Sequence, residues 1–118
     1  MRFATIVLLF STITVHSQTL YLDYSHWEQM PASFRQMYIA GAFDAVSVIT
    51  VPEGAEGAMA ARHYNECVAK ARLSIVQLEK NMKEYAETQP DAPSKPVPTI
   101  LMRYLTSLCG LPGATVRG

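Results

Sequence analysis

Charge is scarce in this sequence and balanced in sign. Only 17% of its 118 residues are charged, with 10 basic and 10 acidic side chains, whereas soluble domains average about 25%. Nucleic-acid-binding proteins usually carry a basic excess, so this balance argues against that class. The hydrophobic fraction of 49% is sufficient to form a core, which excludes a wholly disordered chain. The length is that of one domain.

Familiar catalytic motifs are also missing from the sequence. It contains no phosphate-binding glycine loop, no His-Glu-x-x-His and no Gly-x-Ser-x-Gly. His63 and Cys67 are spaced to share one helix face, but two ligands are only half of a zinc site. We therefore predict no enzyme activity, no metal and no cofactor. An enzyme would instead require Asp44 or His63 in a polar cleft.

The one long hydrophobic run lies at the N-terminus. Arg2 is followed by an apolar stretch over 3–15, and Val15 and Ser17 are small residues at the spacing of a cleavage site. This arrangement is typical of a secretory signal peptide, and the run is shorter than the roughly 20 residues that span a membrane. The alternatives are an N-terminal anchor or a buried first strand.

We therefore expect residues 1–17 to be removed. Residues 18–118 would then form a single helical domain with a core over about 27–110, located in the periplasm or secreted. Cys67 and Cys109 are the only cysteines, and an even count in an oxidising compartment favours one disulfide. In the chain-entropy model, closing a loop of the length between these cysteines with a disulfide stabilises the folded chain by roughly 4 kcal/mol. A metal site or a catalytic thiol is the less favoured alternative.

Apolar spacing predicts a first helix over 31–50. Pro31 suits a first turn, and Pro52 ends the segment, leaving 53–57 as a loop. On this helix Asp44 is an acid in an apolar stretch, and Gly41 is costly in mid-helix. We interpret both as structural: Gly41 would admit a neighbouring helix, and Asp44 would bond a backbone N–H or the hydroxyl of Tyr38. Arg35 and Gln36 would lie on the opposite side.

Two further helices are expected beyond this loop. Residues 58–71 form either a short helix or an irregular segment. Ser74 and Gln77 match a capping box that begins a helix with an apolar stripe. Its charged residues are expected on a solvated face; these are Glu79, Lys80, Lys83, Glu84 and Glu87.

A proline-rich connector over 88–98 follows, and its prolines exclude helix. The last helix then runs from about residue 97 to Cys109, with Gly110 as its cap. Its apolar stripe comprises Ile100, Leu101, Tyr104, Leu105 and Leu108. Together these elements predict an all-α fold, a small three- to four-helix bundle with one disulfide.

The sequence also resembles a known family. The features concerned are the helix with Tyr38, Gly41 and Asp44, the cysteine at 67, the helix start at 74–77, the segment 85–90 and the apolar helix ending at Cys109. They are similar to the Rap/Tai family of small exported helical proteins. Members are immunity proteins that neutralise cell-wall amidase effectors of type VI secretion, and the resemblance covers about residues 27–110.

The resemblance implies an exported protein-interaction module, an immunity protein that binds and inhibits an amidase. The candidate partner-binding residues lie in two loops: Glu53, Gly54 and Glu56 in the first, Pro90 and Asp91 in the second. The partner would be a protein, with no nucleic acid and no membrane insertion after cleavage, and a homodimer is an open alternative. Two other functions remain open: a small periplasmic acid-stress chaperone, or a structural exported domain without a dedicated partner.

Overall fold

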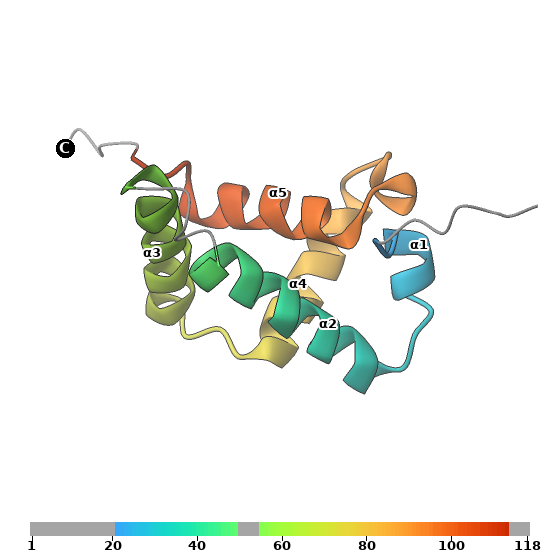
Figure 1. The fold of residues 1–118 in the computed structure, drawn as a ribbon. Coiled ribbons are helices and arrows are strands. Elements are labelled where there is room, and N and C mark those ends of the chain that lie inside the picture. Colours follow the sequence, from blue (N-terminus) through green and yellow to red (C-terminus); the bar gives the residue numbers. More distant parts are fainter. Residues whose placement is uncertain (1–20, 50–54, 114–118) are drawn as a thin grey trace, which may run out of the picture.

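The computed structural model describes residues 21–49 and 55–113, and this part of the chain is all-α (Figure 1). The predicted all-α class is therefore confirmed. The elements are α1 (Tyr24–Trp27), α2 (Ala32–Asp44) with the π-helical η1 (Ala45–Ile49), α3 (Ala55–Lys70), α4 (Ile75–Glu87), the 3-10 helix η3 (Ala92–Ser94) and α5 (Val97–Cys109).

Three helices form the centre of the molecule. Helices α2, α4 and α5 pack against one another, α3 packs on η1 and α5 at one end, and α1 packs on η3 and α5 at the other. Figure 1 shows α3 and α1 at opposite ends of α5. One hydrophobic cluster joins all of these helices, and its largest fully buried side chains are Trp27, Ile39, Met82, Ile100, Leu101, Leu105 and Val97.

Local signals placed two helices correctly. The Ser74 hydroxyl accepts a hydrogen bond from the Gln77 N–H, and the Gln77 side chain accepts one from the Ser74 N–H, so the capping box that begins α4 is confirmed. Helix α5 ends at Gly110, whose φ of 73° suits glycine. The predicted apolar stripe of α5 is wrong at its last member, because Leu108 is 43% exposed.

Several boundaries differ from expectation. The segment 58–71 is helical, and α3 already begins at Ala55, inside the predicted 53–57 loop. The connector contains η3 despite its prolines, because proline in a first turn needs no N–H and its φ suits a helix. After Asp44 the first long helix continues as the π-helical η1. Thr50 lies outside the described residues.

The structural roles expected for Gly41 and Asp44 were wrong. Gly41 is exposed, and a Cβ built there would meet no atom within 4 Å, so no helix approaches it. Asp44 is exposed too, and the described residues give its carboxylate no hydrogen bond. Tyr38 is half-buried and packs against the core cluster. Gly41 and Asp44 therefore both lie on the exposed surface of α2, whereas Ile39 of the same helix is buried in the core.

Glu79 is the main exception to the predicted solvated face of α4. It is 5% exposed, and its carboxylate accepts a hydrogen bond from Arg35 Nε at 2.6 Å. Gln36 Nε2 donates to the other oxygen at 3.4 Å. Arg35 and Gln36 therefore face α4 rather than solvent, and this polar contact joins α2 to α4.

The predicted disulfide joins Cys67 of α3 to Cys109 of α5, which are 42 positions apart in sequence and have their Cα atoms 5.8 Å apart. Tyr64 and Val68 of α3 are buried beside this link. The bond therefore holds α3 against the end of α5.

Candidate functional site

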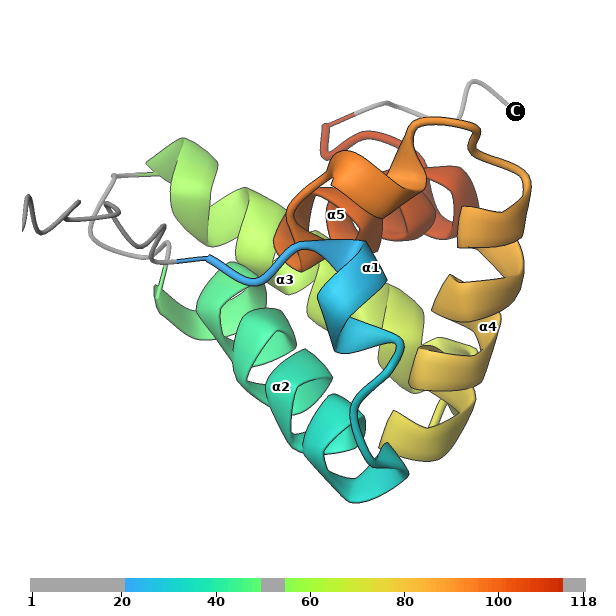
Figure 2. The same cartoon turned by 90° about the vertical axis from the view of Figure 1, so that its right-hand side faces the viewer.

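The connector between α4 and α5 is folded onto the N-terminal end of the described chain. The Tyr24 N–H donates to the Lys95 carbonyl at 2.9 Å, and the Val97 N–H donates to the Leu22 carbonyl at 2.9 Å. Figure 2 shows α1 lying directly beside this part of the chain. These two backbone hydrogen bonds fix the connector in place, so residues on either side of it form a defined surface.

An exposed ion pair ties the connector to α5. Arg103 donates through two nitrogens to the two carboxylate oxygens of Asp91, at 3.0 and 3.1 Å. Lys95 Nζ is 4.0 Å from the same carboxylate. Hydrogen bonding to Arg103 lowers the pKa of Asp91 below its usual value. The paired geometry orients both side chains, although an exposed pair of this kind contributes little stability.

A groove runs along α5 beside this ion pair. It has a volume of about 690 Å³. We call it the α5 groove, and it is lined by Tyr85, Pro98, Thr99, Met102, Arg103, Thr106 and Ser107. The ring centroids of Tyr85 and Tyr104 are 6.0 Å apart, and Tyr104 accepts a hydrogen bond from Asn81 Nδ2 at 3.2 Å. The groove wall is therefore anchored to the core.

A smaller pocket lies on the α1 side of the connector. It has a volume of about 230 Å³, and we call it the Tyr24 pocket; its lining includes Tyr24, Glu28, Glu87, Gln89, Pro90 and Pro93. Burial, followed by the negative charges of Glu28 and Glu87, raises the pKa of Tyr24 to about 12. The Tyr24 hydroxyl is consequently neutral at physiological pH and can both donate and accept a hydrogen bond.

The structure places the predicted partner-binding residues unequally. Pro90 is exposed and lines the Tyr24 pocket, and Asp91 is exposed beside the α5 groove. Glu53 and Gly54 lie outside the described residues. Glu56 lies in the first turn of α3 rather than in a loop, and its side chain is not described. Of the two predicted loops, the second contributes to the surface around the connector.

Sequence reasoning missed the other residues of this surface. Tyr24 begins α1 and Glu28 caps its end, more than sixty positions from Pro90 in the chain, and Arg103 lies in the middle of α5. No spacing rule connects positions this far apart. The available signal was local. Glu28 and Glu87 are acidic residues near helix ends, next to the aromatic and proline-rich segments that form the pocket.

The cysteines are not available for chemistry as free thiols, because both are in the disulfide. His63 Nε2 lies 3.0 Å from the Gly110 carbonyl oxygen, so its ring nitrogen is hydrogen-bonded to the end of α5. Within the described ranges no three His, Cys, Asp or Glu side chains gather closely enough to hold a metal ion.

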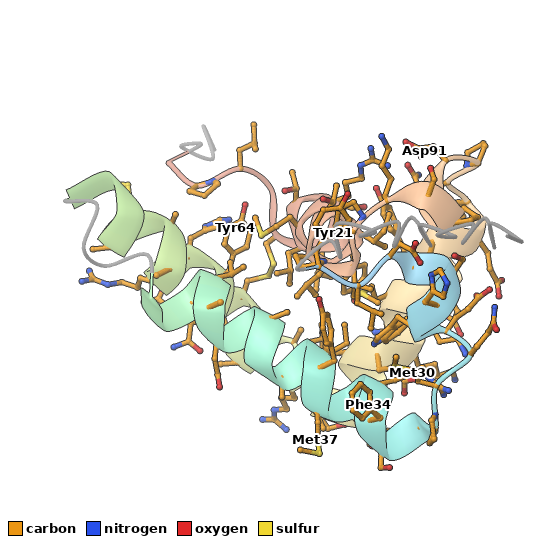
Figure 3. The ribbon with its side chains drawn as sticks, turned by 45° about the vertical axis from the view of Figure 1, so that its right-hand side comes forward. Tyr21, Met30, Phe34, Met37, Tyr64 and Asp91 are labelled. Atoms are coloured by element: carbon orange, nitrogen blue, oxygen red, sulfur yellow. A yellow bond between two sulfur atoms is a disulfide. The ribbon has the colours of Figure 1, made fainter. Side chains whose placement is uncertain are left out.

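Apolar side chains are also exposed on α2, far from the connector. Phe34 is 51% and Met37 is 75% exposed. Figure 3 shows both on the outer side of α2, at the opposite end of the view from Asp91. Since they lie apart from the groove, they offer a matched control surface for experiments on it.

The fold and the connector surface define a class: a small all-α domain closed by one disulfide, with a groove and a pocket on either side of a fixed connector. No family model, curated protein or solved structure matches the chain. Among the helices of the described segments, none combines the length and the apolar character that crossing a membrane requires.

Proposed function

We propose that this chain is an exported protein that binds another protein through the α5 groove. The signal-peptide pattern at residues 1–17 supports export, and the disulfide is compatible with an oxidising compartment. In the finer form of the proposal the partner is a cell-wall amidase, and binding inhibits it. That form rests on the resemblance to Rap/Tai immunity proteins.

The observation that carries the proposal is the composition of the α5 groove. Met102, Tyr85 and Arg103 belong to residue types that are enriched in protein interfaces. Met102 can adapt its flexible side chain to an inserted apolar group. Arg103 is already oriented by Asp91, so a partner meets an ordered guanidinium group without the entropy cost of ordering it.

To identify the partner, the mature protein is immobilised and exposed to periplasmic extract, and the retained protein is identified. Substitutions in the α5 groove then test whether binding uses this groove. We expect Met102→Glu to reduce retention of that partner at least about tenfold, because it buries an unpaired charge at the contact. Met37→Glu makes the same chemical change on α2 and should leave retention unchanged. Equal retention by wild type and Met102→Glu would refute binding through this groove.

The amidase form needs a separate measurement. Hydrolysis of peptidoglycan amide bonds by a purified cell-wall amidase effector is followed with increasing amounts of the mature protein. Inhibition that saturates at one protein per enzyme and is weakened by Met102→Glu supports it. Full amidase activity in the presence of micromolar protein would contradict the immunity role. Binding of another partner would still be decided by the experiment with periplasmic extract.

A further inference from the structure

One of the residues that line the Tyr24 pocket is a buried tyrosine whose hydroxyl has no hydrogen-bond partner in the described part of the chain. Tyr24 is 5% exposed, and the described residues give its hydroxyl no hydrogen bond. No fully buried side-chain nitrogen or oxygen in the described ranges lacks a hydrogen bond, so this hydroxyl retains some accessible surface, and Tyr24 is one of the residues that line the Tyr24 pocket. Its ring is held from behind by Trp27, with ring centroids 5.5 Å apart.

Two unpaired carboxylates share this pocket with the hydroxyl. Glu28 caps the C-terminal end of α1, and Glu87 is the last residue of α4. Both are exposed, and neither has a hydrogen bond or ion pair within the described part of the chain. Both also act electrostatically on Tyr24. The negative end of the α4 dipole lies beside Glu87 and adds to the same potential.

The remaining walls are apolar and the space is small. Pro90 and Pro93 line one side, with Ala86 and Ala92 buried beneath. The volume of about 230 Å³ is below the roughly 300–1,000 Å³ of sites for drug-sized ligands. It therefore suits one side chain or a small amine rather than a large cofactor.

We propose that the Tyr24 pocket binds an organic cation, an ammonium or guanidinium group on a short apolar stem. The two carboxylates supply the opposite charge, the Tyr24 hydroxyl accepts a hydrogen bond from the N–H, and the prolines and alanines contact the stem. The cation is either a free amine or a basic side chain of a protein. The pocket lies across the connector from the α5 groove, so the inference does not depend on the proposed function.

Titration of the secreted form of the protein with n-butylammonium, followed by NMR, tests the proposal directly. We expect saturable shifts with a dissociation constant in the millimolar range, and none with the neutral isostere n-butanol. Replacing Glu28 and Glu87 together by Gln should weaken binding about threefold to tenfold, because both carboxylates are exposed. Glu84→Gln, one turn away on α4 and also exposed, removes the same type of charge and should leave binding unchanged.

The hydroxyl and the source of the cation are tested in the same assay. Tyr24→Phe keeps the ring and should weaken binding about threefold to tenfold through the lost hydrogen bond. Capped lysine binding more tightly than n-butylammonium would indicate a protein side chain, and the reverse order a free amine; either supports the site. No saturation up to about 50 mM, or unchanged binding when both carboxylates are removed, would overturn it.

Discussion

Glu79 offers a sharp test of how this fold is held together. Its side chain is 7% exposed, that of Arg35 is 17% exposed, and Arg35 Nε lies 2.6 Å from Glu79 Oε1. Arg35 also donates to the Met30 carbonyl, and its guanidinium carbon is 5.9 Å from the centroid of the Trp27 ring. One carboxylate therefore neutralises a cation that fixes the α1–α2 turn and the contact between α2 and α4.

Glu79→Gln keeps the shape and removes the charge. Breaking a buried ion pair by removing one partner costs about 3–5 kcal/mol, because the other charge is left unpaired. In Glu79→Gln, Arg35 retains some exposure and its hydrogen bond to the Met30 carbonyl. We therefore expect the free energy of unfolding to fall by about 2–4 kcal/mol. A typical domain has a free energy of unfolding of about 5–15 kcal/mol, so this decrease is a large share of it.

Urea unfolding followed by far-UV circular dichroism measures the loss. With a slope of about 2 kcal/mol per molar, the middle of the usual range, the midpoint should fall by about 1–2 M. Glu84→Gln is the control on the same helix, since Glu84 is 63% exposed and 4.0 Å from Lys80; it should change the free energy of unfolding by less than about 0.5 kcal/mol.

A double variant separates charge from packing. Arg35→Met combined with Glu79→Met removes both charges at once, and such replacements are often neutral or stabilising. We therefore expect the double variant to recover most of the stability lost in Glu79→Gln. With Arg35→Met and Glu79→Met measured singly to complete the cycle, we expect a coupling energy of at least about 1 kcal/mol. If Glu79→Gln unfolded at the same urea concentration as Glu84→Gln, the reasoning about this ion pair would be refuted.

Two further predictions follow from glycine geometry and from the burial of a tyrosine. Gly41 has open space around it and no positive φ, so Gly41→Ala should raise the free energy of unfolding by about 0.5–1 kcal/mol. Gly110 has a φ of 73°, so Gly110→Ala should lower it. Thermal unfolding that showed the same sign of change for both variants would contradict this account. Because the pKa of Tyr24 is raised from 10.0 to about 12, its contribution to stability is complete below pH 10 and is lost as pH rises through 12. Absorbance at alkaline pH should therefore show one late-ionising tyrosine that is missing in Tyr24→Phe, provided the wild type is still folded by circular dichroism; ionisation of all tyrosines together would count against the buried position.

Local rules were sufficient for much of the helical framework. The capping box at Ser74 depends on residues three positions apart, and the end of α5 depends on the freedom of one glycine, Gly110. The disulfide could also be predicted, because two cysteines permit only one pairing. The all-α class follows from these short-range signals, since each is decided within about one helical turn.

The tertiary structure alone decided which side of each helix is buried where the sequence is ambiguous. Glu79 belongs to a charged run, and solvation is the cheaper state for such a residue unless a cation lies opposite; Arg35, 44 positions away, provides it. The connector surface has the same origin. Tyr24 meets Pro90 and Glu87 only because backbone hydrogen bonds fold the connector onto α1. Burial depends on contacts between distant segments, and no local pattern contains that information.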